Sequence, residues 1–212
     1  MDLLKTNFFI PIILLYFLAL IFPSLYSYNF FHVSYFYLNV GSLFVPFIYF
    51  FGDIITELYG FRLFKKIVIY AALVSAIFTG LTYLLVIISN KLNPAMSIHY
   101  QKIFGHNNRI MIAVIFGITI SSLLNGFILS KLRKLFKHKF FIPRSIASSI
   151  TGEFLEAIFV GFIGYLFIIP VYNIFIMASS VMVYRTLANI PLSTIASVII
   201  ILVRKFDKLE KI

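Results

Sequence analysis

The chain has 212 residues, of which 61% are hydrophobic and only 12% are charged, and its mean hydropathy is +1.02. Soluble domains carry about a quarter charged residues, so this composition excludes an ordinary soluble domain. It predicts an all-α integral membrane protein that forms one domain over residues 1–212. The absence of cysteine from the sequence also excludes disulfides, thiolate zinc sites and thiol nucleophiles.

Three membrane spans are expected in the first half of the chain. The first covers 8–28, and we interpret it as a retained helix because the apolar stretch continues without an A-x-A-like signal-peptide cleavage site. The second covers 34–58 and contains Pro46, which removes a backbone hydrogen bond and so predicts a kinked second helix. The third covers 67–90, which contains 24 residues and no charge, and about 20 residues suffice to cross a bilayer.

The segment over 91–109 is the longest polar connection, and it carries His99 and His106. These two histidines could be metal ligands. However, the segment holds no acidic residue and no third histidine. We therefore interpret both as loop residues at the membrane surface and expect no metal site.

Three further spans are expected over 110–130, 146–169 and 175–203, which gives six transmembrane helices in total. The fifth span opens with small polar residues. Its Ser148-x-x-x-Gly152 spacing allows neighbouring helices to approach closely, so most of these small residues are expected to serve packing.

The lysines and arginines are unevenly distributed between the two sides that six helices create. The N-terminus, the 59–66 and 131–145 connections and the C-terminus hold 14 of them, whereas the opposite connections hold 3. Cytoplasmic loops carry an excess of Lys and Arg, so we expect both termini in the cytoplasm and the chain in the inner (plasma) membrane. The same asymmetry explains the net charge of +11 without a nucleic-acid partner, and the cluster over 131–144 suits anionic lipid headgroups.

Four of the seven acidic residues lie within predicted spans, namely Asp53, Glu57, Glu153 and Glu156. Asp53 and Glu57 are four residues apart, which on a helix places both on one face. An ionisable group near the bilayer centre costs roughly 2.5–3.5 kcal/mol, so these acids and Arg185 in the sixth span indicate a polar site inside the membrane. Two alternatives stay open: Asp53 and Glu57 face water at a helix end, or Arg185 forms a structural ion pair with an acid of the fifth span.

No Walker-type loop, H-E-x-x-H zinc motif or G-x-S-x-G elbow occurs in the sequence. The chain is therefore predicted not to be an enzyme, and no cofactor is expected. Asn125 lies near the end of the fourth span, where an amide can hydrogen-bond between helices.

Residues 53–60, D-I-I-T-E-L-Y-G, resemble the D-x-x-x-E-x-Y-G signature of the queuosine precursor transporter family, also called the VUT family. Residues 125–132, N-G-F-I-L-S-K-L, resemble that family's N-x-x-x-x-x-K-L ending of the fourth helix. Residues 144–159, R-S-I-A-S-S-I-T-G-E-F-L-E-A-I-F, are similar to its R-x-x-x-S-T-x-x-G-Q-x-x-D-x-x-F segment. The resemblance covers most of the chain, in the same order and with the same number of helices.

The sequence departs from the family pattern at polar positions. Glu153 stands where the family usually has Gln, Glu156 where it usually has Asp, and Arg185 where it usually has Lys. The resemblance implies a membrane transporter that imports 7-deazaguanine bases such as preQ0 and preQ1, or that salvages queuine or queuosine, for tRNA modification.

These residues lead to a binding hypothesis for a purine-like base. A guanine-like base presents N1–H and an exocyclic amino group as adjacent donors, and one carboxylate, for which Glu153 is our first choice, can accept both. Asn125 could hydrogen-bond to the opposite carbonyl or ring nitrogen of the base, and aromatic rings could stack on it. Asp53 and Glu57 would shape the cavity or contact the aminomethyl cation of preQ1. The expected substrate-binding residues are Asp53, Glu57, Asn125, Glu153, Glu156, Arg185, Tyr49, Phe50 and Phe159.

Two other functions stay open. A substrate-binding subunit similar to those of energy-coupling-factor vitamin importers would also be a small six-helix protein, but it needs separate ATPases. A membrane enzyme that acts on lipid or prenyl substrates is the third interpretation. The expected partners are the substrate and the lipid bilayer, and a homodimer with a second copy of the chain stays an open alternative.

Overall fold

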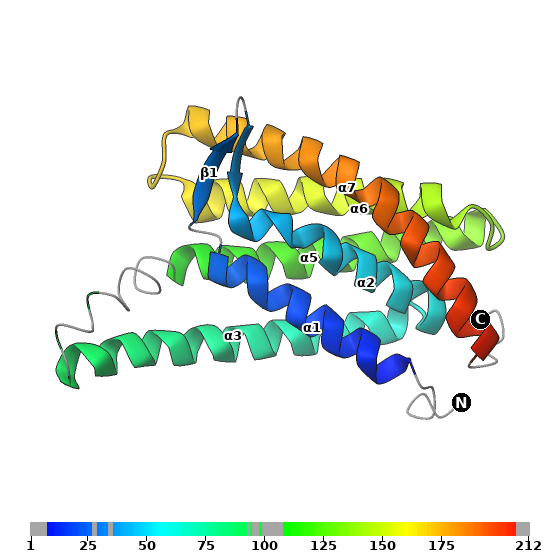
Figure 1. Ribbon diagram of the computed structural model, residues 1–212, viewed down its shortest axis with the longest axis horizontal. Coiled ribbons are helices and arrows are strands. Elements are labelled where there is room, and N and C mark those ends of the chain that lie inside the picture. Colours follow the sequence, from blue (N-terminus) through cyan, green and yellow to red (C-terminus); the bar gives the residue numbers. More distant parts are fainter. Residues whose placement is uncertain are drawn as a thin grey trace.

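The computed structural model shown in Figure 1 describes residues 8–26, 29–33, 36–92, 94, 98 and 108–206. It is 88% helical and contains one short β-hairpin. In chain order the elements are α1 (Phe9–Tyr26), β1 (Phe30–Val33), β2 (Phe36–Asn39), the 3₁₀ helix η2 (Val40–Leu43), α2 (Val45–Tyr59), α3 (Phe61–Leu92), α5 (Asn108–Leu135), α6 (Phe141–Phe159), the π-helix η4 (Val160–Gly164) and α7 (Val171–Phe206).

Among the described residues, six helices are long and apolar enough to cross a membrane. This confirms the predicted all-α membrane fold with six spans. Successive helices run in opposite directions, so the start of α1 and the end of α7 lie at the same end of the bundle (Figure 1). Only 22% of the most apolar window of α3 is buried, so this helix turns most of its side chains towards lipid.

The second span begins later than expected. We predicted a helix over 34–58, but within this range Phe36–Asn39 form strand β2, which pairs antiparallel with β1. Aromatic residues are favoured in strands, and periodicity cannot assign a short apolar run to helix or strand. The hairpin packs on α7, where the N–H of Tyr37 donates to Oγ of Ser180 at 3.2 Å.

Asn39 links the hairpin to the second helix. Its Oδ1 accepts a hydrogen bond from the N–H of Ser42 at 2.6 Å, which caps the start of η2. Pro46 then lies in the first turn of α2, where its missing N–H breaks no helical hydrogen bond. The second helix is bent by 32°, which confirms the predicted kink, although Pro46 lies in the first turn of α2 and not in its middle.

The third, fourth and sixth spans extend beyond their predicted bounds at both ends, whereas the fifth begins earlier than predicted and, with η4, ends at Gly164 instead of 169. We expected the fourth span to end at 130, but α5 continues to Leu135, and α6 begins at Phe141 instead of 146. The predicted bounds mark where the apolar run meets the first charges, whereas a helix can continue through charged residues outside the hydrocarbon layer. α7 is likewise continuous over Val171–Phe206, although it contains Pro191.

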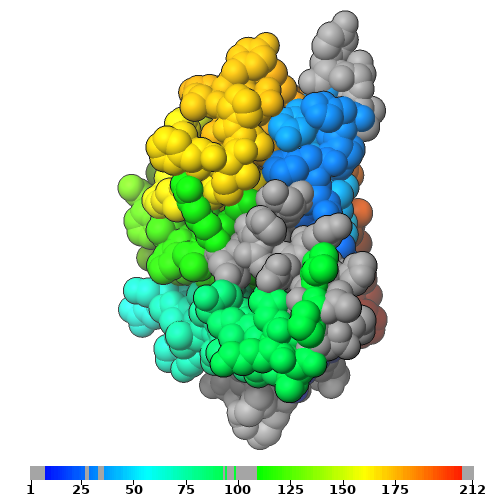
Figure 2. Space-filling view, turned by 90° about the vertical axis from the view of Figure 1, so that its left-hand side faces the viewer, coloured from blue at the N-terminus to red at the C-terminus, as the bar shows by residue number. Residues whose placement is uncertain are grey.

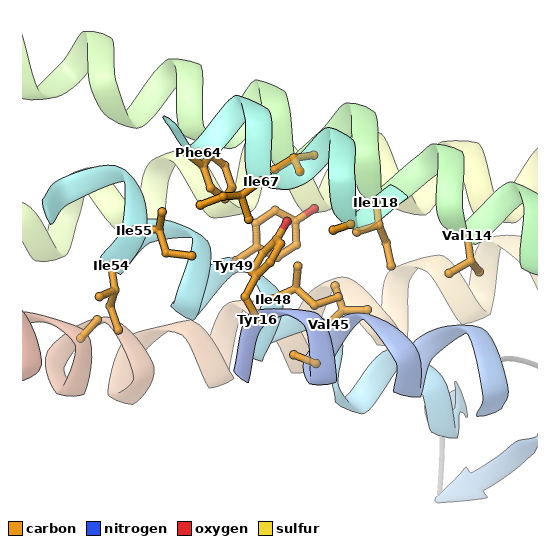
Figure 3. Close-up of a cluster of buried hydrophobic side chains, with 14 of the residues drawn as sticks. Tyr16, Val45, Ile48, Tyr49, Ile54, Ile55, Phe64, Ile67, Val114 and Ile118 are labelled. Atoms are coloured by element: carbon orange, nitrogen blue, oxygen red, sulfur yellow. The ribbon is translucent and has the colours of Figure 1, made fainter. Parts of the chain in front are cut away.

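The apolar core lies between α1, α2, α3, α5 and α7. Tyr16 of α1 and Tyr49 of α2 lie at its centre, and Phe64 of α3 lies next to them (Figure 3). The rings of Tyr16 and Phe64 meet edge to face, with centroids 5.8 Å apart. A Cβ atom at Gly126 would lie 2.6 Å from the Phe64 ring, so this glycine allows α3 to dock on α5.

The two ends of the bundle differ in charge. Among the described residues, the end opposite the hairpin carries most of the cations, namely Arg62, Lys65, Lys66, Lys131, Arg133, Lys134, Lys137, Lys139, Arg144, Arg204 and Lys205. We call it the basic end. The hairpin end, where the hairpin and the α6–α7 connection lie side by side (Figure 2), carries Lys91 and Arg109 within the described ranges.

Candidate functional site

Buried polar side chains run along α2 and are joined by polar side chains of α5, α6 and α7. We call the whole group the polar column. Tyr49, Asp53 and Glu57 are spaced four residues apart, so they share one face of the helix, and at 1.5 Å per residue they span about 12 Å of its length. None of the three is more than 2% exposed. The prediction of a shared face is confirmed, and the alternative that the two acids face water is wrong.

Glu57 lies among three arginines that come from three helices. Its Oε2 accepts a hydrogen bond from Nη1 of Arg144 of α6 at 3.3 Å. Its Oε1 lies 3.3 Å from Nη2 of Arg204 of α7 and 3.6 Å from Nε of Arg133 of α5. The side chains of Arg133 and Arg144 are buried, whereas that of Arg204 is 23% exposed. This group, the Glu57 cluster, ties the four helices together at the basic end.

The connection between α5 and α6 supports the Glu57 cluster. Nε of Arg133 donates to Nδ1 of His138 at 2.9 Å, and Nε of Arg144 donates to the carbonyl oxygen of Lys139 at 2.8 Å. Desolvation and the neighbouring guanidinium of Arg133 lower the pKa of His138. The neutral ring can accept this hydrogen bond, so the connection holds both guanidiniums in place.

Asp53 lies one turn further from the basic end, and its hydrogen-bond partners are neutral donors. Its Oδ1 accepts from Nδ2 of Asn125 of α5 at 2.7 Å. Its Oδ2 accepts from the hydroxyl groups of Ser145 and, at 3.4 Å, of Ser149, both on α6. Oγ of Ser145 also lies 3.0 Å from Oγ of Ser193 of α7. Side chains of α5 and α6 therefore converge on this carboxylate, and α7 joins them indirectly through Ser193.

Two further acids lie on α6, and each meets α7. Glu156 is ion-paired with Nη1 of Arg185, and Oε2 of Glu153 accepts a hydrogen bond from Nδ2 of Asn189 at 3.0 Å. Arg185, Asn189 and Ser193 are four residues apart, so one face of α7 meets one face of α6. The alternative in which Arg185 forms an ion pair with an acid of the fifth span is therefore confirmed, with Glu156 as the partner.

Tyr49 lies at the end of the column that is further from the basic end. Its hydroxyl donates to Oγ of Ser121 of α5 at 2.8 Å, and the phenol lies within electrostatic range of Glu153 and Arg185. A Cβ atom at Gly152 would lie 2.9 Å from the Tyr49 ring and 2.9 Å from the carbonyl oxygen of Ser121. The absence of a side chain at Gly152 therefore allows α6 to approach both α2 and α5.

Three buried polar atoms of these residues have no hydrogen-bond partner in the part of the chain that the structure describes: Oδ1 of Asn125, Oε1 of Glu153 and Nε of Arg185. None of the three residues is more than 3% exposed. An unsatisfied buried polar group costs about 1–3 kcal/mol, and such exceptions call for an explanation. Two acceptors and one donor are therefore available to a ligand within the column.

A small cavity borders the Glu156–Arg185 pair on the side of the hairpin. Its volume is about 30 Å³, whereas sites for small molecules usually measure about 300–1,000 Å³. Asn39 and Tyr165 line it, and Nδ2 of Asn39 donates to the hydroxyl of Tyr165 at 3.3 Å. The helices are closed around the polar column, so a ligand larger than a few water molecules requires them to separate.

A family model described as "Putative vitamin uptake transporter" matches residues 39–202. The matched range is more than half of the chain and contains the polar column from Tyr49 to Ser193. The chain belongs to this family. No curated protein and no solved structure matches this transporter. The family description names an uptake activity.

The transporter brings most of the predicted site residues together in its column, namely Tyr49, Asp53, Glu57, Asn125, Glu153, Glu156 and Arg185. The other two predicted residues are half-buried and contact apolar neighbours. The ring of Phe50 packs on Phe51 with centroids 4.8 Å apart, and Phe159 lies beside Gly117 of α5.

Several partners in the column were not predicted from the sequence. The spacing of Arg185, Asn189 and Ser193 could have revealed the polar face of α7, because four-residue spacing marks one side of a helix. Arg133 and Arg204 offered no such signal, since basic residues at helix ends also suit lipid headgroups.

Metal binding finds no support in the described residues, where no group of three His, Asp or Glu could hold an ion. His99 and His106, the two candidate metal ligands of the 91–109 segment, lie outside the described residues.

Proposed function

We propose that this transporter imports 7-deazaguanine precursors of queuosine, such as preQ0 and preQ1. The observation that carries the proposal is Oε1 of Glu153, a buried carboxylate oxygen that lacks a hydrogen-bond partner among the described residues. The other oxygen of this carboxylate is held by Asn189. A guanine-like base offers N1–H and its 2-amino group as adjacent donors, and a carboxylate accepts such donors in charge-assisted hydrogen bonds.

Arg185 and Asn125 supply the remaining polar groups for the base. Nε of Arg185 is an unpartnered donor within the described part of the chain, and we assign it to the carbonyl oxygen of the base. Nδ2 of Asn125 already donates to Asp53, so Asn125 is no longer assigned to the carbonyl oxygen of the base. Its Oδ1 is assigned instead to accept a hydrogen bond from a ring N–H. Tyr49, within electrostatic range of Glu153, is the ring that we assign to stacking.

The charges of the column favour a cationic member of this substrate class. Glu156 is balanced by Arg185, whereas Glu153 hydrogen-bonds to a neutral amide. The aminomethyl cation of preQ1, which preQ0 lacks, would offset this negative charge. Glu57 already contacts three arginines, so we assign it to closing the basic end and not to the substrate.

We place the basic end in the cytoplasm and the protein in the inner (plasma) membrane, because cytoplasmic loops are rich in Lys and Arg. The cavity beside Arg185 and the hairpin then lies towards the outside. Substrate entry requires α7 and the hairpin to move away from α2 and α6, a rigid-body rearrangement of the kind that transporters use.

The test uses the purified protein in liposomes without any ATPase. Uptake of labelled preQ1 is measured in competition with 7-deazaguanine and with 7-deazahypoxanthine, which lacks the 2-amino group. We expect 7-deazaguanine to compete roughly 100-fold better or more, because a site built on hydrogen bonds rejects an analogue that leaves its polar groups unpaired. Glu153→Gln should reduce the difference in competition between the two bases. The control variant Thr151→Ala should keep the wild-type difference, since the exposed Thr151 donates its hydrogen bond to the carbonyl oxygen of Ala147 on its own helix.

Three outcomes would contradict parts of the proposal. Equal competition by both bases in the wild type would exclude Glu153 as the reader of the amino group. Binding without uptake would indicate a subunit that depends on separate ATPases. Release of a chemically altered base would indicate an enzyme.

A further inference from the structure

Asp53 differs in its surroundings from Glu57, the other acid of α2, and from Glu156 of α6. Glu57 and Glu156 form ion pairs with arginines, whereas the polar contacts of Asp53 within the described residues come from Asn125, Ser145 and Ser149. Asp53 is 1% exposed. A carboxylate in an apolar interior is costly unless it is paired with a cation or becomes neutral.

The charged groups that face Asp53 from the surrounding helices increase this cost. Glu57 lies one turn along α2, and Glu153 faces it from α6, so both electrostatic neighbours are acidic. The arginines of α5, α6 and α7 at the basic end contact Glu57. From α1 and α3, the groups next to this part of α2 are the phenol of Tyr16 and the ring of Phe64, which flank Gly52. None of these groups neutralises an ionised Asp53.

The geometry around Asp53 suits a proton. The distances from its oxygens to the Asn125 amide and the Ser149 hydroxyl are 2.7 and 3.4 Å, and Ser145 lies 3.0 Å from Ser193. These are hydrogen-bond distances, so a hydrogen atom lies between the two polar atoms of each pair. Hydroxyl groups can reverse from donor to acceptor, and they therefore accommodate both the carboxylate and the carboxylic acid. Oδ1 of Asn125, fully buried and without a partner in the described part of the chain, offers another acceptor beside them.

We propose that Asp53 is the proton-binding site that couples substrate uptake to a proton gradient. This inference rests on the proposed transport function. A proton from the outer water adds to Oδ2 of Asp53, the resulting O–H donates to Ser145, and the hydroxyl of Ser145 turns to donate to Ser193. When the basic end opens, the proton returns to cytoplasmic water and the carboxylate is restored. The carboxyl is neutral while the helices rearrange and charged only where water reaches it.

The first test detects the proton without any substrate. Infrared difference spectra of the purified wild type between acidic and alkaline pH should show a buried carboxyl C=O band that is replaced by carboxylate bands. This band should be missing in Asp53→Asn and present in Glu153→Gln. A wild-type spectrum without a band that depends on Asp53 would overturn the assignment.

The second test measures coupling in liposomes with preQ1 as the probe. In the wild type, an acidic exterior should drive internal preQ1 above its external concentration, and uptake should acidify the lumen, as a trapped pH dye reports. In Asp53→Asn this accumulation should disappear, while exchange of internal for external preQ1, which needs no net proton movement, continues. Thr151→Ala should behave like the wild type.

The outcomes separate the two proposals. Accumulation that persists in Asp53→Asn, uptake without acidification of the lumen, or accumulation that follows a sodium gradient would each overturn the proton site. If the wild type transports no deazaguanine under any gradient, the proposed substrate is wrong, and the infrared titration still decides whether Asp53 binds a proton.

Discussion

Arg185 of α7 is ion-paired with Glu156 of α6, and each side chain is only 3% exposed. The pair lies beside the small cavity and joins α6 to α7, the helices that move apart in the proposed substrate entry. Its contribution can be measured, because removing one partner leaves a buried charge without a counterion.

We predict that Arg185→Gln and Glu156→Gln each destabilise the transporter by about 3–5 kcal/mol, since an uncompensated buried charge is expensive. The double variant should recover much of this loss because it leaves neither charge. Thermal unfolding of the purified variants in detergent measures the effect. An Arg185→Gln variant that is as stable as the double variant would show that the pairing is wrong.

The arginines of the Glu57 cluster should contribute unequally. Arg144 is buried and approaches Glu57 with both Nη atoms, at 3.3 and 3.5 Å, so Arg144→Ala should cost about 3–5 kcal/mol. Arg204 is 23% exposed, so solvent screens its charge and Arg204→Ala should cost about 1 kcal/mol or less. Unfolding midpoints of the two variants test this order, and a larger loss for Arg204→Ala would contradict it.

Gly152 should not tolerate a side chain. Its added Cβ would lie 2.9 Å from both the carbonyl oxygen of Ser121 and the Tyr49 ring, so Gly152→Ala should cost about 1–3 kcal/mol through overpacking. Gly80 on the lipid-facing α3 is the matched control, because nothing lies within 4 Å of its added Cβ. We expect Gly80→Ala to unfold like the wild type. Equal thermal stability of the two variants would refute the close approach of α6.

The orientation in the membrane can be tested with single cysteines, since the natural chain contains none. Tyr172, 74% exposed at the start of α7, lies at the hairpin end, and the exposed Lys137 lies at the basic end. In intact cells, a membrane-impermeant thiol reagent should label Tyr172→Cys, and it should label Lys137→Cys only after the membrane is permeabilised. The reverse pattern would place the basic end outside.

Part of the fold could be read from local properties of the chain. Apolar runs of 20 or so residues identify membrane helices because each must span the hydrocarbon layer, and all six were found. Helix bounds were less accurate where charged residues extend a helix beyond the lipid, as at the end of α5. The hairpin before α2 was missed because its aromatic residues suit a strand as well as a helix, and its contact with Ser180 of α7 is a tertiary one.

By itself, the sequence determined that this protein lies in a membrane and that Asp53, Glu57, Glu153, Glu156 and Arg185 are the costly residues within its spans. Four-residue spacing also placed Asp53 and Glu57 on one helix face. Only the tertiary structure decided which cations neutralise which acids. The contacts of Glu57 with Arg204 and of Asp53 with Asn125 join residues 147 and 72 positions apart. Two neighbouring carboxylates thus acquire opposite surroundings, arginines for Glu57 and neutral donors for Asp53, because the helices that bring those partners are set by packing across the whole bundle.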